Sequence, residues 1–561
     1  MMQNELIRIA ITSSILLCVL PVMAAPILPG PDAGQTVREL EKKPDLSVPK
    51  STAPLQPEQA PVPAAQPNAD LRMTVKSIHV SGNSKIATAE LESLLADLVG
   101  SEHTLAELNE GAARITAYYR QRGYIVARAY IPAQEIKDGA VMINVEEGRI
   151  GEERINNQSK LSDQRANGYF SDINSGEVLQ AAPVERALLL LNETPGVGSA
   201  RASLQPGASV GATDLVIELT PSAPYAGNIQ ADNYGNYYTG EYRLGAELGF
   251  NSPLKIGDQV TLRALASNQN LTYAYASYQI PVGGKGLRMG GAYSATSYRL
   301  GQELAASQTH GTASIASLFA VYPFIRSNLS NLSGTITLED KQLNDVYSTA
   351  PVDKTVQVGT LGLVGNHQDL LGGAGVTLYN LSLATGRLSM DTASLLIDEA
   401  TLHANGAFTR IDYNVNRLQG LSDGYSLSLA LSGQFASKNL NSSEQFSLGG
   451  AYGVRAYPQG EAPGDEGYLA TIELRRSFTQ MLQGVMFCDA GSIMINRYPM
   501  PNLAASNTRF LSGVGVGVNA VVAGVQIKTD LAVRGSGGRP TSEPTTMNRK
   551  FRVWAELSKQ F

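Results

Sequence analysis

The chain has 561 residues, of which 17% are charged, and its formal net charge at pH 7 is -6. Both signs of charge are dispersed, so the sequence lacks the basic stripe that is typical of nucleic-acid-binding proteins, and we expect no nucleic-acid partner. The length allows several domains or one large barrel with appendages.

Residues 1–24 are predicted to be a secretory signal peptide. Arg8 supplies a short basic region, an apolar run follows over residues 9–22, and the small Ala24 fits the cleavage rule. An uncleaved membrane anchor is the alternative, although the run is short for a spanning helix. The chain has 2 cysteines. Cleavage would leave Cys488 alone, so we expect no internal disulfide.

The next segment, residues 25–43, is predicted to contain a short polar helix. Asp32 and Gln35 have the spacing of a capping box, and Val37 and Leu40 lie three residues apart. The segment has almost no apolar face, and an isolated helix of this length is marginal in water. We therefore expect it to persist only in a polar cavity, with a loose tail as the alternative.

A proline-dense segment follows at residues 44–72. Prolines are mixed there with Ala, Gln and Ser, a composition that favours an extended, semi-rigid linker.

Residues 73–149 show the order strand, helix, helix, strand, strand. The predicted elements are a strand at 75–80, a helix with Leu at 91, 94, 95 and 98, a helix opened by the capping box Thr104 and Glu107 and closed by Gly123, and strands at 124–131 and 141–145.

Residues 150–222 repeat this order more loosely. A strand at 152–157 precedes a helix through Val184, Leu188 and Leu191, and a hairpin around Pro206 closes the unit. Two tandem α+β units favour a periplasmic binding arm, with one irregular α+β domain as the alternative.

From residue 223 to residue 561 the pattern changes to weak two-residue alternation between Gly-, Asn-, Asp- and Ser-rich turns. In 468–476 and 551–561, one set of alternate residues is mainly apolar and the other carries most of the polar residues, the signature of a transmembrane antiparallel β-barrel. A barrel in lipid must close, because an open edge leaves backbone groups unpaired. The length corresponds to about 16 strands. A soluble β-sandwich or propeller is the alternative.

Several stretches resemble one family, the outer-membrane transporters of two-partner secretion, of the haemolysin-activator and filamentous-haemagglutinin exporter type. Residues 119–148 resemble its first polypeptide-transport-associated (POTRA) domain, and 188–197 and 204–207 resemble the end of the second. DNYGNYYTGEY (232–242) resembles the entry to its barrel. GVRAY (453–457) and FCDAG (487–491) resemble its loop and barrel-wall motifs, and the resemblance covers essentially the whole mature chain.

The resemblance implies roles for particular residues. Gly453, Val454, Arg455, Ala456 and Tyr457 would lie at the tip of the sixth extracellular loop, folded back into the lumen. The family more often has Gly where this chain has Ala456. Phe487, Asp489 and Gly491 would form the barrel-wall partner, the helix in 25–43 would plug the resting pore, and Phe561 would serve outer-membrane sorting by the barrel assembly machinery.

The charges of the two motifs support the same contact. An outward Asp489 would place a carboxylate against hydrocarbon, so we prefer the register that turns Asp489 and Phe487 inward. Arginine suits the partner role, because its planar guanidinium is always charged and binds a carboxylate with two hydrogen bonds. Two unrelated charges in a polar pore are the alternative.

Two other patterns suggest chemistry. Residues 207–211 spell G-x-S-x-G, but a strand rather than a helix follows, so we expect a hairpin turn and no hydrolase. Glu461, Asp465 and Glu466 could bind Ca²⁺, although a solvated loop face is the stronger expectation. The sequence shows no zinc, P-loop or dinucleotide-binding spacing, and no metal, cofactor or enzymatic activity is expected.

The leading functional expectation is export of a β-rich exoprotein, whose N-terminal secretion domain the POTRA arm would recognise. A barrel assembly insertase is the alternative, but such proteins usually carry more POTRA units. A passive porin or a surface adhesin is a third reading, but a porin would not need two periplasmic units or the Arg455–Asp489 arrangement.

Overall fold

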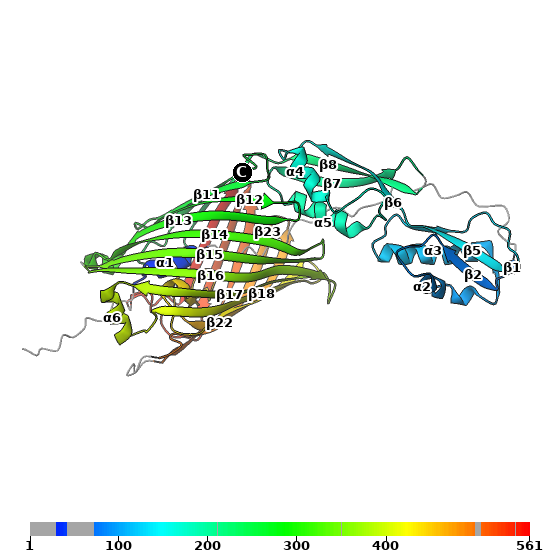
Figure 1. Cartoon of the computed structure of the whole chain (residues 1–561). Coiled ribbons are helices and arrows are strands. Elements are labelled where there is room, and N and C mark those ends of the chain that lie inside the picture. Colours follow the sequence, from blue (N-terminus) through cyan, green and yellow to red (C-terminus); the bar gives the residue numbers. More distant parts are fainter. Residues whose placement is uncertain (1–29, 42–71, 210, 349, 500–505, 545) are drawn as a thin grey trace, which may run out of the picture.

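The computed structural model describes residues 30–41, 72–209, 211–348, 350–499, 506–544 and 546–561. The predicted signal peptide and almost all of the predicted linker lie outside these residues. The described chain forms a β-barrel with a two-domain arm at one end (Figure 1). We call the two ends of the barrel the arm end and the far end. No helix of the described residues is long and apolar enough to span a membrane.

The first arm domain has a three-stranded sheet, ordered β2-β5-β4, and a small β1-β3 sheet. Its apolar core includes Leu91, Leu108, Ile115 and Tyr119, each 0% exposed. The predicted capping box is present, because the Thr104 hydroxyl accepts from the Glu107 N–H and the Glu107 carboxylate accepts from the Thr104 N–H. The elements are β1 (Arg72–Thr74), β2 (Ser77–Ser81), α2 (Thr88–Ser93), η1 (Ala96–Leu98), β3 (Glu102–Thr104), α3 (Leu105–Gln121), β4 (Arg128–Tyr130) and β5 (Ala140–Glu146).

Two sequence predictions for this domain are wrong in extent. The strand expected over 124–131 is only β4, because the chain first turns, with the Ala127 N–H donating to the Tyr124 carbonyl at 3.1 Å. The helix expected through Leu98 stops at Ser93 and resumes as the 3-10 turn η1. The leucine spacing still identified buried positions, since burial rather than an unbroken helix determines the pattern.

The second arm domain has one sheet, ordered β6-β8-β7. The predicted helix and closing hairpin are both present, and the helix packs Leu188 and Leu191 against Ile217 and Leu219 of the sheet. The elements are β6 (Arg149–Asn157), α4 (Asp163–Asn167), η2 (Gly168–Phe170), α5 (Ala181–Asn192), β7 (Val197–Pro206) and β8 (Ala212–Pro221).

The barrel closes through sixteen antiparallel strands, with β26 paired to β9, as the sequence predicted. The alternation predicted for 551–561 is confirmed, with Phe551 and Val553 exposed outside and Arg552 and Trp554 buried inside. The strands are β9 (Tyr225–Asp232), β10 (Arg243–Asn251), β11 (Gln259–Ser267), β12 (Thr272–Val282), β13 (Leu287–Arg299), β14 (His310–Arg326), β15 (Ser330–Tyr347), β16 (Ala350–Asp369), β17 (Gly375–Met390), β18 (Gly406–Gly420), β19 (Tyr425–Ala436), β22 (Glu466–Thr479), β23 (Leu482–Met494), β24 (Thr508–Val522), β25 (Val525–Arg534) and β26 (Phe551–Gln560).

The loops at the far end add short elements. The loop over residues 437–465, here called the folded-back loop, contains η4 (Ser442–Glu444), β20 (Phe446–Ser447) and β21 (Pro463–Gly464). Two neighbouring loops carry η3 (Gln302–Ser307) and α6 (Thr392–Ala400).

Helix α1 (Ala33–Leu40) lies within the barrel (Figure 1). The expectation of a helix with almost no apolar face is wrong. Val37 and Leu40 are each 4% exposed and join a lumen cluster that includes Leu343 and Phe408. Ala33 and Thr36 are also buried, and their spacing places them on the same face of the helix as Val37 and Leu40. The buried face of α1 therefore consists of two larger apolar residues and two small ones.

The second arm domain is docked directly on the barrel. Glu193, which follows α5, pairs with Arg326 at 2.6 Å and with Arg288 at 3.3 Å. The backbone N–H of Asn328 donates to Glu185 at 2.7 Å. These contacts fix the arm beside the barrel opening at that end.

Candidate functional site in the barrel lumen

The folded-back loop delivers the predicted arginine motif to the barrel wall. Two glycines permit its tight path. Gly450 has φ +119°, and a side chain on Gly453 would place its Cβ 2.0 Å from the Leu448 carbonyl oxygen. The motif residues Val454 and Tyr457 are both 0% exposed, and the Tyr457 hydroxyl donates to the carbonyl of Ser536 at 3.1 Å.

Arg455 and Asp489 are in contact, as the sequence predicted. The Arg455 side chain donates to both carboxylate oxygens, from Nε at 2.9 Å and from Nη2 at 2.8 Å. The Arg455 backbone N–H adds a third bond to the same carboxylate at 3.1 Å. Since Asp489 is 0% exposed and Arg455 is 4% exposed, the pair is secluded from bulk water.

The strand register places the barrel-wall motif as preferred from the sequence. Phe487 is 5% exposed, whereas Cys488 is exposed on the outer face. The Arg455 guanidinium carbon lies 3.4 Å from the Phe487 ring centroid, a cation–π contact. Gly491 also needs to be small, because a Cβ there would lie 2.6 Å from the Tyr468 carbonyl oxygen.

Ala456 fits its position without strain. It is absent from the described residues with positive φ, so a methyl group is compatible with its backbone. Its Cβ would lie 2.5 Å from a Cβ added to Gly513 on β24, and Ala456 itself is 2% exposed. The methyl that distinguishes this chain is therefore accommodated by a glycine on the wall.

Sequence reasoning missed three further partners of Arg455. Its Nη1 donates to Glu473 at 2.8 Å and lies 3.7 Å from Asp530, and its carbonyl accepts from the Trp554 indole N–H at 2.7 Å. Glu473 and Trp554 belong to the inward-facing residues of their alternating strands. This alternation is the sequence pattern that could have identified them as candidate partners in the lumen. The arginine thus connects the loop to β22, β23, β25 and β26.

The N-terminal end of α1 is fastened to the loop and the wall. Asp32 caps the helix by accepting from the Gln35 N–H at 2.8 Å, and the Ser442 hydroxyl donates to it at 2.7 Å. Lys354 lies 3.5 Å from the same carboxylate, and Asp345 accepts from the Ala33 N–H at 2.8 Å.

The predicted capping box of α1 is only half formed. The Gln35 side chain donates to Glu39 at 3.0 Å and to the carbonyl of Gly460 at 3.3 Å, so it contacts the folded-back loop instead of closing the box.

The C-terminal end of α1 meets a cluster of charges. Glu41 pairs with Lys341 at 3.1 Å, and Lys341, which is 1% exposed, also pairs with Glu444 at 3.0 Å. Arg410 contacts Glu444 at 2.9 Å. Helix, loop and wall therefore share one ionic network, and the folded-back loop contacts α1 through Ser442 and the barrel wall through its own Arg455.

Of the acidic residues considered for Ca²⁺, Glu461 and Asp465 are buried and not on a solvated loop face, whereas the half-buried Glu466 begins β22 and pairs with Arg497 at 3.3 Å. Glu461 and Asp465 are 0% exposed. Glu461 accepts from the backbone N–H groups of Thr541 and Ser542, each at 2.8 Å, and pairs with Arg509. These protein donors occupy the oxygens of the Glu461 carboxylate. No group of three or more potential metal ligands occurs among the described residues.

Two other sequence features are structural. The G-x-S-x-G stretch joins β7 to β8, two paired strands, as expected for a hairpin. The terminal Phe561 exchanges backbone hydrogen bonds with Gly227 at 2.9 and 3.0 Å, and its side chain is 59% exposed outside the barrel.

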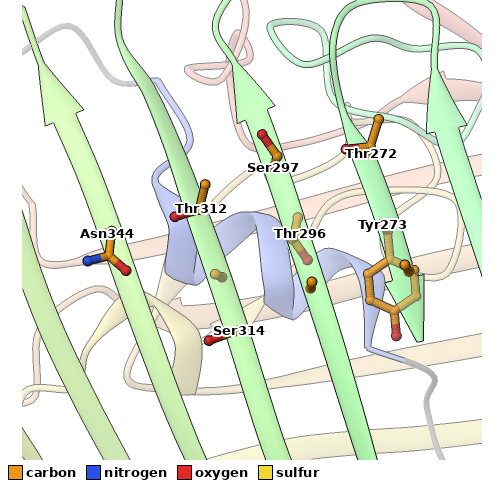
Figure 2. A pocket seen from close by; sticks show the side chains of 10 residues that line it. Thr272, Tyr273, Thr296, Ser297, Thr312, Ser314 and Asn344 are labelled. Atoms are coloured by element: carbon orange, nitrogen blue, oxygen red, sulfur yellow. The ribbon is translucent and has the colours of Figure 1, made fainter. Parts of the chain in front are cut away.

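A hollow of about 390 Å³ lies on the barrel wall, away from the arginine site. It is lined by residues of β12 to β15, mostly small ones together with Tyr273 and Asn344, and α1 runs behind these strands (Figure 2). Thr272, Ser297 and Thr312 are exposed there, whereas the alternate residues Thr296 and Ala313 are buried. The hollow therefore opens on the outer face of the barrel wall.

Comparisons with known proteins agree with this architecture. The family described as haemolysin secretion/activation protein ShlB/FhaC/HecB matches residues 211–520, and the POTRA domain of ShlB type matches residues 73–148. The heme/hemopexin transporter protein HuxB of Haemophilus influenzae is 29% identical over 547 residues, which is 95% of each chain. The hemolysin transporter protein ShlB of Serratia marcescens is 24% identical and aligns over 89% of this chain and 88% of its own.

A solved structure of CdiB from Escherichia coli has the same fold. The TM-score is 0.71 at 19% sequence identity, and the alignment covers 94% of this chain and 96% of CdiB. The family match alone spans more than half of the present chain. The chain belongs to the haemolysin secretion/activation protein family ShlB/FhaC/HecB.

Proposed function

We propose that the chain is an outer-membrane pore that exports a large β-rich exoprotein, such as a haemolysin, an adhesin or a contact-dependent toxin, by two-partner secretion. The observation that carries this proposal is the closed barrel whose lumen holds helix α1, while a two-domain arm stands at one mouth. The arm end is periplasmic and the far end faces the cell surface. The chain transports without a catalytic step of its own.

The arm would capture the N-terminal secretion domain of the exoprotein. Its two sheets have β2 and β4, and β6 and β7, as edge strands among the described residues, and such edges offer unpaired backbone groups to an extended segment. Folding of the exoprotein outside the cell would then drive export.

Helix α1 would close the resting pore, and the folded-back loop would support it. The loop contacts α1 through Ser442 and Gly460, and the wall through Arg455. Loss of the Arg455 contact with the wall would therefore change both the position of the folded-back loop and its contacts with α1. Insertion of the barrel would use the barrel assembly machinery, with Phe561 in the sorting signal and the outer face against lipid.

The Arg455→Ala variant tests this role. Removing one partner of a secluded ion pair costs about 3–5 kcal/mol and leaves Asp489 and Glu473 without their shared cation. We expect secretion of the exoprotein into the medium to fall to background while the barrel still inserts, as judged by its heat-dependent electrophoretic mobility.

Arg475→Ala is the matched control. Arg475 also pairs with Glu473, at 2.6 Å, but its side chain is 30% exposed, and within the described part of the chain its hydrogen bonds go to Glu473 and not to the folded-back loop. Secretion should persist in this variant. Normal secretion by a well-inserted Arg455→Ala chain would contradict the assigned role.

An assembly insertase is the alternative function. The described part of the chain has two α+β units, which supports export, because insertases usually carry more. If the chain secreted no exoprotein but restored the insertion of other β-barrels in cells that lack their own insertase, the alternative would be favoured.

A further inference from the structure

Helix α6 turns its apolar side chains toward solvent. Leu396 and Ile397 are 65% and 62% exposed, whereas Ser394 and Asp398 are 6% and 5% exposed. A helix held by ordinary hydrophobic burial has the opposite orientation. Four residues at positions i, i+3, i+4 and i+7 form the exposed apolar stripe: Ala393, Leu396, Ile397 and Ala400.

Polar contacts hold the helix in this orientation. Asp391 caps its first turn and accepts a hydrogen bond from the N–H of Asp353, at the far end of β16, at 3.0 Å. Asp398 accepts from the N–H groups of Ala404 and Asn405, each at 2.9 Å. Rotating the apolar stripe inward would break these bonds, so its exposure is part of the local structure.

The exposed apolar surface continues onto neighbouring loops. The side-chain amide of Asn439, in the folded-back loop, donates to the carbonyls of Leu402 at 2.6 Å and Tyr498 at 2.9 Å. The side chains of Leu402 and Tyr498 are 38% and 60% exposed. We call the combined surface the rim patch: Ala393, Leu396, Ile397, Ala400, Leu402 and Tyr498.

The rim patch lies beyond the lipid-facing part of the barrel. α6 is at the end of the barrel opposite the arm (Figure 1). Between it and the exposed Leu361 of β16, the outer face carries hydrogen-bonded polar side chains. Gln357 donates to Asp340 at 3.0 Å, and Asn344 donates to Asp353 at 2.6 Å. Such groups are too costly to place against hydrocarbon, so the patch stands above the membrane.

The size and charge of the patch narrow the choice of partner. Its exposed side chains offer on the order of 500 Å², whereas a stable interface buries about 800 Å² per partner, so a lasting dimer of this chain is disfavoured. The charged residues of α6 are Asp398 and Glu399, with no Lys or Arg, which disfavours phosphate-bearing lipid headgroups. A small, apolar surface suits a neutral or basic apolar segment that the pore itself brings close.

We propose that the rim patch contacts apolar segments of the exoprotein as they leave the pore. The inference rests on the proposed function, because export supplies the partner at high local concentration. Each contact is weak and brief, and it covers aliphatic side chains of the emerging chain until they are buried in the folded exoprotein.

Site-specific photo-crosslinking tests this contact in the full-length chain. A photoreactive p-benzoylphenylalanine replaces Leu396, or Glu399 as the control on the same helix, in cells that co-produce an epitope-tagged exoprotein secreted by the unmodified chain. Glu399 is exposed but lies off the apolar stripe. We expect crosslinks to the exoprotein from position 396 to exceed those from position 399 by at least about fivefold, since apolar contacts dominate such surfaces.

The outcomes separate this proposal from the proposed function. Equal crosslinking at both positions, or crosslinks only to lipopolysaccharide or to a second copy of the chain while secretion continues, would overturn the rim contact alone. Failure of the unmodified chain to secrete any exoprotein would overturn both.

A double variant supplies a second measurement. Leu396→Ser with Ile397→Ser should leave insertion of the barrel unchanged, because both side chains are already exposed. The rate at which secreted exoprotein becomes protease-resistant should fall about two- to fivefold relative to Glu399→Gln. An unchanged rate would count against the proposal.

Discussion

At the scale of single residues, the carboxylates around Arg455 are not equivalent. Asp489 receives two side-chain bonds and one backbone bond from Arg455, whereas Glu473 is shared with Arg475 and Asp530 lies 3.7 Å from Arg455 beside Lys528. Asp489 therefore determines where the guanidinium lies, and the other two balance its charge. A lysine could not reproduce this arrangement, because it has no planar fork.

Glu147, which directly follows β5 of the first arm domain, accepts a comparable set of hydrogen bonds within that domain. It is 5% exposed and accepts from the N–H groups of Ser84 at 2.6 Å and Lys85 at 2.7 Å, and from the Tyr119 hydroxyl at 2.9 Å. Burial alone raises the pKa of Glu147, but the bonds from Ser84, Lys85 and Tyr119 outweigh it, so the pKa lies below its ordinary value of 4.5.

The lowered pKa predicts how the first arm domain responds to pH. The carboxylate stabilises the fold fully above the unfolded pKa, and this contribution is lost as the pH falls through the lower, folded pKa. In Glu147→Gln we expect the free energy of unfolding at pH 7 to fall by about 1–3 kcal/mol, because an amide NH₂ cannot accept these bonds. Hydrogen exchange of α3, corrected for intrinsic rates, should show the loss.

Glu146→Gln is the control for this prediction. Glu146 is half-buried and adjacent in the chain. Protection in the unmodified chain should decrease below pH 4.5 toward that of Glu147→Gln, while Glu146→Gln follows the unmodified chain. Equal protection in all three chains at pH 7 would contradict the assignment.

Some residues of the site could be predicted from sequence, and others could not, for a physical reason. Asp489 was identifiable because only one register keeps its carboxylate out of lipid. Glu473 and Trp554 were placed on inward faces, but which inward residue Arg455 reaches depends on the relative position of strands far apart in sequence. The burial of Glu461 was missed because its donors, Thr541 and Ser542, lie in another loop.

At the scale of elements, α1 shows why a short helix can be predicted while its environment cannot. The N-cap at Asp32 depends only on nearby residues and could be predicted from the sequence. Whether Ala33 and Thr36 form part of a buried face depends on the lumen wall against which they pack. The same dependence explains α6. Its sequence has a helical stripe, yet the side that faces solvent is set by Asp391 and Asp398 contacts outside the helix.

The cap of α1 leads to a prediction about the closed pore. Asp32→Ala removes the helix cap together with the bonds from Ser442 and Lys354, while the rest of the helix is unchanged. Loss of an N-cap costs about 1 kcal/mol, and the tertiary bonds add to this. In planar bilayers we expect the open fraction of the channel to rise at least about fivefold.

Glu39→Gln is the matched control for the plug. Glu39 also accepts a bond from Gln35, at 3.0 Å, but a glutamine carbonyl can replace that acceptor. Its open fraction should stay near that of the unmodified chain. A similar rise in both variants would point to general loosening of α1, and no rise in Asp32→Ala would remove the plug role from this helix.

At the scale of the whole molecule, polar and charged side chains join the arm to the barrel. Each domain could be predicted from its own pattern of apolar residues, whereas their relative position depends on contacts such as those of Glu193 with Arg288 and Arg326 on barrel strands. No periodicity carries that information, because these charges look like ordinary solvated residues in the sequence. The joint matters for export, since it sets where a captured segment lies relative to the pore.

The joint predicts that one side chain controls the orientation of the arm. Glu193→Gln should weaken the docking by about 1.5–3 kcal/mol, the range for hydrogen bonds to charged groups, because the Arg326 side chain is only 4% exposed. Spin labels at the exposed Ser203 of the arm and Ser422 of a barrel turn, in a Cys488→Ser background, would report a broader distance distribution than in the unmodified chain.

Asp172→Asn is the control, since its pair with Lys285 has side chains 66% and 63% exposed, and such surface pairs contribute about 0–1 kcal/mol. Broadening in Glu193→Gln alone, accompanied by slower secretion, would show that the arm must be held still for export. Broadening without any change in secretion would instead mean that capture tolerates a moving arm, and that the joint serves stability only.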